Sequence, residues 1–133
     1  MYERRGTLSP EELADLFIRA WGTDKSGYED VLARSFTWVT ARDGASLVGF
    51  VNVAWDGGVH FFLLDTTVDP DHQRRGVGLA VIRAAIDACR GNGHWLHVDA
   101  DAELMERLYL RVGFGRTSAS ITNLQRGSRP VLP

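Results

Sequence analysis

The sequence has one cysteine, no long apolar run and no excess of charge of either sign, and each shortage excludes a class of protein. Cys89 alone cannot form a disulfide framework or a multi-cysteine zinc site, and a lone cysteine is more typical of a reducing compartment. The longest apolar stretch, 59–68, contains His60 and Asp65 and is shorter than the roughly 20 residues that span a bilayer. The formal net charge of −2 indicates no basic surface for nucleic acid or anionic lipid. Since residues 1–13 also lack an apolar core of signal-peptide length, we expect a cytoplasmic protein without nucleic-acid or membrane partners.

The rest of the composition is that of one globular domain. The chain has 133 residues, of which 44% are apolar and 24% charged, and it is long enough to bury a core without disulfide or metal support. We expect a single domain over 1–133, with its core at about 8–124 and a frayed tail at 125–133. Only glycine, with 14 residues, is unusual, and its positions carry the functional argument.

Periodicity predicts a group of strands between helices. Ser9 and Glu12 can form a capping box, so a helix is expected from Pro10 to about Trp21, followed by a shorter helix at 28–35. Two-fold alternation and Asp-Gly turns predict strands at 36–42, 46–55 and 59–68. The last of these is apolar on both faces, which favours a place in mid-sheet with helices above and below.

The second half of the chain alternates helices and strands. We expect helices at 76–90 and 101–112, a strand at 95–98 and one or two strands at 116–124, with a further short strand at 2–7. This order predicts an α/β fold in which an antiparallel meander and a β-α-β-α-β unit form one mixed sheet flanked by helices.

The most informative segment is the glycine-rich stretch 73–80, QRRGVGLA, between a strand and a helix. Backbone N–H groups at such a turn, with the helix dipole and two arginines, favour a bound phosphate. Gly76 and Gly78 would allow close backbone approach, although two glycines can also simply shape a turn. A dinucleotide fingerprint is less favoured because its third glycine would fall at Val81.

Two motifs together resemble the GNAT N-acetyltransferase superfamily. Gln-Xaa-Xaa-Gly-Xaa-Gly at 73–78, after a strand ending in Val-Asp-Pro, is similar to the loop that binds the pyrophosphate of acetyl-CoA in that family. Leu108-Tyr109 followed by Gly113-Phe114 is similar to its second signature. The resemblance extends over about 8–124 and implies a single-domain GNAT-like fold with acetyl-CoA as cosubstrate.

The resemblance also implies roles for individual residues. Tyr109 would hold the sulfur and protonate the leaving thiolate, and the main chain of Thr67 and Val68 would bond the pantetheine arm beside the splayed strand 95–98. One cofactor contact is in doubt, because Ala102 stands where the family often has asparagine. The pyrophosphate loop would comprise Gln73, Arg74, Arg75, Gly76, Val77, Gly78 and Leu79.

Asp65 is the first candidate for the general base. A carboxylate within Phe61-Phe62-Leu63-Leu64 is costly unless it is hydrogen-bonded or functional, and burial would raise its pKa toward a working range. Alternation places it on one face with Leu63 and Thr67 unless a bulge changes the parity. The alternatives are a structural carboxylate satisfied by backbone or arginine, and a base role for His60 or His97 acting through water.

The acceptor site is expected at the first two helices and their loop. Trp21 and Tyr28, with Asp24 and Glu29 nearby, suit a small cationic amine, although ordinary packing and a solvated acidic loop explain them slightly better. No metal is expected, since the acidic group at 99–103 lacks the spacing of a calcium loop. Cys89 shares an apolar helix stripe and is expected to be an inert buried thiol.

The sequence therefore predicts an acetyl-CoA-dependent N-acetyltransferase that acts on a primary amine, preferentially of a small molecule, by direct attack in a ternary complex. The alternatives are a peptide or protein amine as acceptor, and a non-catalytic acyl-CoA-binding or sensor module. Whether the chain is a monomer or a homodimer stays open.

Overall fold

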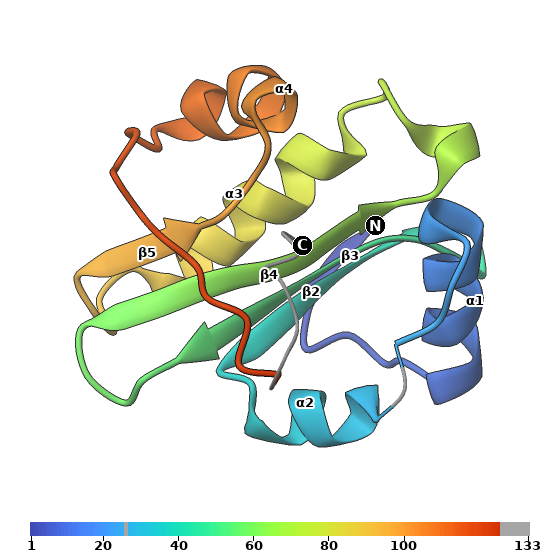
Figure 1. The fold of residues 1–133 in the computed structure, drawn as a ribbon. Coiled ribbons are helices and arrows are strands. Elements are labelled where there is room, and N and C mark those ends of the chain that lie inside the picture. Colours follow the sequence, from blue (N-terminus) through green and yellow to red (C-terminus); the bar gives the residue numbers. More distant parts are fainter. Residues whose placement is uncertain (26, 126–133) are drawn as a thin grey trace.

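The centre of the molecule is a five-stranded mixed sheet in the order β1-β2-β3-β4-β5 (Figure 1). The computed structural model describes residues 1–25 and 27–125, so the tail expected at 125–133 lies almost entirely outside the described residues. The pairs β1–β2, β2–β3 and β3–β4 are antiparallel, and β5 runs parallel to β4. The strands are β1 (Tyr2–Arg4), β2 (Thr37–Asp43), β3 (Ser46–Trp55), β4 (His60–Val68) and β5 (Trp95–Val98).

Helices cover the two faces of this sheet unequally. On one face α3 (Val77–Cys89) packs against the inward side chains of β2, β3 and β4, which form the larger core. On the other face α1 (Pro10–Trp21) and α2 (Tyr28–Arg34) enclose a smaller core around Phe17 and Phe50. No helix in the described part of the chain is long and apolar enough to cross a bilayer.

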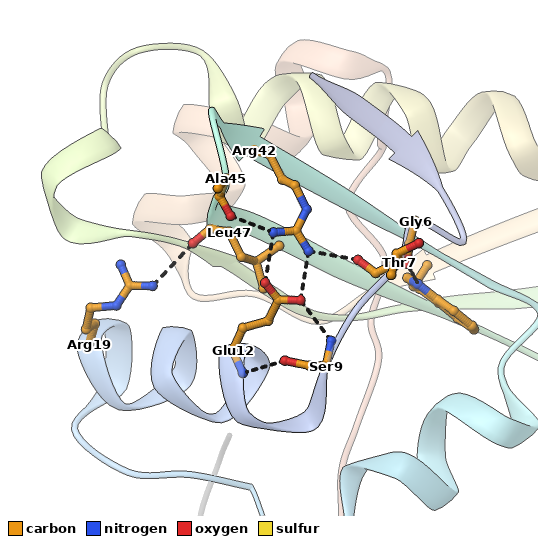
Figure 2. A network of polar contacts seen from close by, with 9 residues as sticks. Gly6, Thr7, Ser9, Glu12, Arg19, Arg42, Ala45 and Leu47 are labelled. Carbon is orange, nitrogen blue, oxygen red and sulfur yellow. Dashed lines mark hydrogen bonds and ion pairs between the residues drawn. The ribbon is translucent and has the colours of Figure 1, made fainter.

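Figure 2 shows how α1 is fixed to the sheet. Ser9 and Glu12 form the expected capping box, in which the Ser9 hydroxyl accepts from the Glu12 N–H and the Glu12 carboxylate accepts from the Ser9 N–H. The same carboxylate receives two hydrogen bonds of 2.8 Å from the Arg42 guanidinium on β2. Arg42 also donates to the carbonyls of Thr7 and Ala45, so one side chain joins the helix start to the β2–β3 hairpin.

The expectation of helices on both faces of β4 is met only in part: α3 covers one face, whereas on the other face α1 contacts β4 and leaves Phe62 and Leu64 uncovered. Phe61 and Leu63 are buried beneath α3, whereas Phe62 and Leu64 on the opposite face are 41% and 42% exposed. The smaller core formed by α1 and α2 reaches β2 and β3 through Trp38, Leu47 and Phe50 and includes no residue of β4. An apolar run therefore did not guarantee burial on both faces.

The region after β5 differs most from the expectation. The strands expected at 116–124 are not formed among the described residues, and β5 is an edge of the sheet. Ile121 and Leu124 are 46% and 91% exposed, so pairing of this segment would have no buried apolar face to support it. The helix expected at 101–112 is three consecutive turns of different pitch: α4 (Ala102–Leu104), the π-helical η2 (Met105–Tyr109) and the 3-10 helix η3 (Leu110–Val112).

Candidate active site

A cleft of about 640 Å³ opens where the end of β4, the start of α3 and the η2–η3 segment meet. It brings together residues far apart in the sequence, including most of those expected to bind the cofactor. Thr67, Arg75 and Val77 do not line it: Thr67 and Val77 are buried, and Arg75 is exposed. The lining includes Trp21, Thr66, Val68, Gln73, Arg74, Gly76, Gly78, Leu79, Leu108 and Tyr109.

The sheet splits at this cleft. β5 pairs with β4 only from His60 to Leu63, where its partner is Val98. β4 continues to Val68, paired with β3 on its other side, so its last residues have no strand partner on the β5 side among the described residues. Their backbone N–H and C=O groups are available there to an extended polar ligand.

The turn from β4 into α3 has the geometry of an anion site. Gly76 precedes the first turn of α3 with φ = +81°, a conformation that favours glycine, and Arg74 also has a positive φ of 64°. A Cβ at Gly78 would meet only Val68 and Leu108, at 3.6 and 3.7 Å, which are ordinary contacts. Protein packing therefore does not require glycine at 78.

A charged network that the sequence did not reveal holds this turn in place. Asp69, 6% exposed, accepts a hydrogen bond from Arg19 of α1, and its Oδ2 lies 3.4 Å from Nδ1 of His72. Arg19 also donates to the Leu47 carbonyl, and His72 contacts Asp43 at 3.0 Å. The partners are 50 and 29 residues apart in sequence, so no local pattern could have predicted them.

Tyr109 reaches the cleft from the π-helical turn. The side chain is 4% exposed, its ring packs edge-on against Phe114, and its hydroxyl donates to Thr66 Oγ1 at 3.1 Å. Burial raises the pKa of the Tyr109 phenol above its ordinary value, so the hydroxyl stays protonated at neutral pH. A π-helical turn widens the helix by one residue and is frequent at functional sites.

Asp65 lies at a bulge in β4, which overturns the expected parity. Its φ is +57°, and the register with β3 shifts between the pairs Asn52–Leu64 and Phe50–Thr67. Leu63 faces the core under α3, but the Asp65 carboxylate accepts a hydrogen bond of 2.8 Å from Tyr28 on the α1–α2 side. Thr66, the next residue, accepts a hydrogen bond from Tyr109, so the candidate base is adjacent in β4 to the residue that bonds the candidate acid.

The surroundings of Asp65 are polar but partly enclosed. The Lys25 ammonium lies 3.4 Å from Oδ1 of Asp65, and the Asp65 side chain is 26% exposed. Burial, together with the adjacent carboxylate, raises the pKa of Tyr28, so this phenol remains a hydrogen-bond donor. The Asn52 amide is 1% exposed beside Tyr28, and its polar atoms have no hydrogen-bond partner of normal geometry among the described residues.

The two residues expected to bind the acceptor lie in different hollows. Trp21 lines the large cleft and stacks on Phe17 at a centroid distance of 5.0 Å. Tyr28 lines a second hollow of about 280 Å³ between α1 and α2, which also contains Asp24 and Lys25. Asp65, bonded to Tyr28, is adjacent in sequence to Thr66 in the first cleft.

The remaining candidates have structural contacts. His60 and His97 lie on the exposed face of β4 and β5, where their ring nitrogens are 2.7 Å apart. Cys89 is buried as expected, and burial raises the pKa of its thiol to about 11, which makes it a poor nucleophile. Among the residues described there is no group of three or more His, Cys, Asp or Glu side chains that could hold a metal.

Comparison with known proteins agrees with this geometry. The sequence profile of the Acetyltransferase (GNAT) family matches residues 8–114. The N-alpha-acetyltransferase RimI of Mycobacterium tuberculosis is 35% identical over 82 residues, which are 59% of this chain and 52% of that protein, so the match spans about half the length of that relative. A probable acetyltransferase of unknown function from meticillin-resistant Staphylococcus aureus has a TM-score of 0.79 at 22% identity, covering 94% of this chain and 99% of that chain. The ribosomal-protein-S18-alanine N-acetyltransferase of Escherichia coli has a TM-score of 0.67 at 23% identity, over 89% and 80% of the two chains.

Proposed function

Because the chain belongs to the acetyltransferase (GNAT) family, we propose that it transfers an acetyl group from acetyl-CoA to a primary amine by direct attack in a ternary complex. The observation that carries this proposal is the arrangement at the β4 bulge. Asp65 and Thr66 are consecutive, and they contact Tyr28 and Tyr109 respectively. The candidate proton acceptor is therefore next in sequence to the residue that holds the candidate proton donor.

The residues of the cleft fit acetyl-CoA, which supplies the acetyl group as a thioester. The N–H groups at the start of α3 would hold the pyrophosphate, with Arg74 adding positive charge. The free edge of β4 from Leu64 to Val68 would bond the pantetheine amides as an added strand. A backbone N–H of that edge would stabilise the negative charge that develops on the carbonyl oxygen.

The acceptor amine must lose a proton before it can attack. An alkylamine with a pKa of about 10.4 is almost fully protonated at neutral pH, so a base has to take up that proton as the reaction proceeds. We assign this task to Asp65, which first binds the ammonium as a counter-ion. The Tyr28 hydroxyl fixes the orientation of this carboxylate.

Tyr109 acts at the other end of the reaction. Its hydroxyl is protonated because burial raises its pKa, and it can donate a proton to the departing thiolate. Thr66 holds the ring orientation through the hydrogen bond to the Tyr109 hydroxyl. Holding the amine and the thioester on one protein supplies the orientation that a bimolecular reaction in water lacks.

The acceptor that we favour is a small cationic amine. The hollow of about 280 Å³ beside Tyr28 and the Asp65 carboxylate suit a compact cation better than a long chain. A peptide α-amine is the second candidate, because the 35% identical relative is an N-alpha-acetyltransferase.

The test is thiol release from acetyl-CoA across small amines, polyamines, aminoglycosides, amino acids and peptides with free N-termini. Turnover confined to small cationic amines supports the proposal, and turnover confined to peptides supports the second candidate. Tight binding of acetyl-CoA without turnover of any amine would show instead a binding or sensor module.

A further inference from the structure

Lys25 is the only lysine in the chain; every other basic residue of the Lys and Arg class is arginine. It lies in the loop between α1 and α2, with a side chain that is 42% exposed. The single alkylamine side chain of this protein lines the hollow beside Tyr28 that is proposed to receive the acceptor amine.

Two contacts define the position of its ammonium. Nζ lies 3.4 Å from Oδ1 of Asp65, the candidate base, and 5.0 Å from the ring centroid of Trp21. Trp21 lines the cleft proposed to bind acetyl-CoA, and Thr66, next to Asp65, accepts the hydrogen bond of Tyr109. The ammonium thus has the counter-ion and the aromatic neighbour that an incoming cationic acceptor needs.

A purely structural ion pair does not explain the choice of lysine. A partly exposed pair contributes about 0–1 kcal/mol to stability. Arginine would form a bidentate pair with a carboxylate and stack on tryptophan at least as well as lysine. Every other Lys or Arg position of this chain is arginine. What lysine alone offers at this position is an amine that becomes a nucleophile when it loses a proton.

We propose that Lys25 is a site of self-acetylation, in an inference that rests on the acetyl transfer proposed above. Asp65 takes a proton from the Lys25 ammonium, and the freed nitrogen lone pair attacks the acetyl carbonyl carbon of acetyl-CoA. The new C–N bond forms, the C–S bond breaks, and Tyr109 protonates the departing thiolate. The second proton lost from the nitrogen restores the Tyr109 hydroxyl through solvent, and the products are an amide on Lys25, free CoA thiol and one proton.

The modification changes the charge of the acceptor site. Acetyl-lysine is neutral, so it keeps neither the ion pair with Asp65 nor the cation–π contact with Trp21. The Asp65 carboxylate then retains Tyr28 as its partner and has lost its internal cation. Self-acetylation would therefore remove a competitor of cationic acceptors.

The experiment incubates the full chain with acetyl-CoA and no added amine, and follows intact mass, peptide mapping and thiol release. We expect one acetyl group on Lys25 and one equivalent of thiol per chain, at a rate per chain that does not depend on protein concentration. Lys25→Arg, which keeps the charge, should give neither signal. Tyr109→Phe should slow the modification about a hundredfold, and the matched variant Tyr2→Phe should not.

The outcomes separate this inference from the proposed function. Unmodified Lys25 in protein that turns over an added amine overturns the inference alone. The inference is also overturned if Tyr109→Phe acetylates Lys25 as fast as wild type, or if the rate of acetylation per chain rises with protein concentration. Acetylated Lys25 without turnover of any added amine supports the inference and contradicts an external acceptor. Loss of all thiol release overturns both. Lys25 can already be acetylated when the protein is purified. In that case, acetyl-Lys25 in the wild type and unmodified Lys25 in Tyr109→Phe are the expected result.

Discussion

A phenol can protonate a leaving thiolate only while it is neutral, and the burial of Tyr109 keeps it so by raising its pKa. Replacing Tyr109 by phenylalanine removes the hydroxyl but leaves the ring packed against Phe114. We expect kcat to fall about a hundredfold with little change in acetyl-CoA affinity, because general acid catalysis contributes on this scale. Steady-state kinetics and calorimetry measure the two quantities. Tyr2→Phe, on exposed β1, is the control, and wild-type turnover in Tyr109→Phe would contradict the assignment.

If Asp65 is the general base, the effect of replacing it should depend on pH. With Asp65→Asn we expect kcat/KM for an alkylamine to fall about a hundredfold at pH 7. The deficit should shrink as pH rises toward the amine pKa of about 10.4, because free amine then needs no base. Initial rates from pH 7 to 10 measure this convergence, with the exposed Asp87→Asn of α3 as control. A deficit that is constant with pH would make Asp65 a purely structural carboxylate.

At the scale of the element, the start of α1 is held to the sheet by the Glu12–Arg42 pair. The Arg42 hydrogen bonds hold the pKa of Glu12 below its ordinary value, so the ionised form is favoured by folding. We expect Glu12→Gln to lower the free energy of unfolding by about 1 kcal/mol at pH 7. This contribution is complete above the unfolded pKa of about 4.3 and is lost as pH falls through the lower folded value.

Urea unfolding at neutral and acidic pH tests this sign. The difference between wild type and Glu12→Gln should disappear below the folded pKa of Glu12, and a difference that grew on acidification would contradict the argument. Glu11→Gln, one residue earlier on the exposed side of the helix, is the matched control and should show no such trend.

The first turn of α3 can be tested through Gly78. A Cβ there makes only ordinary contacts with Val68 and Leu108, so Gly78→Ala should leave the melting temperature nearly unchanged. The same methyl group would lie between the helix start and the pyrophosphate, and we expect the Kd for acetyl-CoA to rise about tenfold or more, since each 1.4 kcal/mol is a factor of ten. Calorimetric titration measures the Kd. Gly115→Ala, with no atom within 4 Å of its Cβ, is the control. An unchanged Kd for acetyl-CoA in Gly78→Ala would show that this turn does not bind the pyrophosphate.

At the scale of the whole molecule, local patterns predicted the elements that are locally determined. Ser9 and Glu12 marked the start of α1, and the Asp-Gly turn separated β2 from β3, because capping and turn chemistry involve neighbours in sequence. The glycine-rich turn before α3 and the position of Tyr109 by the cleft were predictable through a motif for the same reason.

What the sequence could not predict depends on contacts between distant segments. The parity of Asp65 changed because a bulge against β3 inserts one extra residue, and no pattern within β4 marks it. The Arg19–Asp69 pair joins α1 to the turn after β4, and the π-helical turn at Tyr109 arises in a segment whose apolar spacing suits an ordinary helix. The segment 116–124 has strand-forming residues but forms no strand in the described part of the chain, which shows that propensity alone does not make a strand.

The cleft proposed for acetyl-CoA joins β4, α3 and the η2–η3 segment, so it would be absent from the unfolded chain. A ligand that binds only the native state at a hundred times its Kd stabilises it by about 2.7 kcal/mol. For a domain of this length that corresponds to a rise in melting temperature of roughly 5–10 °C. We expect this shift with acetyl-CoA and not with NAD, since Val81 stands where a dinucleotide fingerprint needs its third glycine. Thermal melts with each ligand decide the matter: Gly78→Val should lose the shift, because its larger side chain fills the cradle, and stabilisation by NAD alone would assign the cleft to a different cofactor.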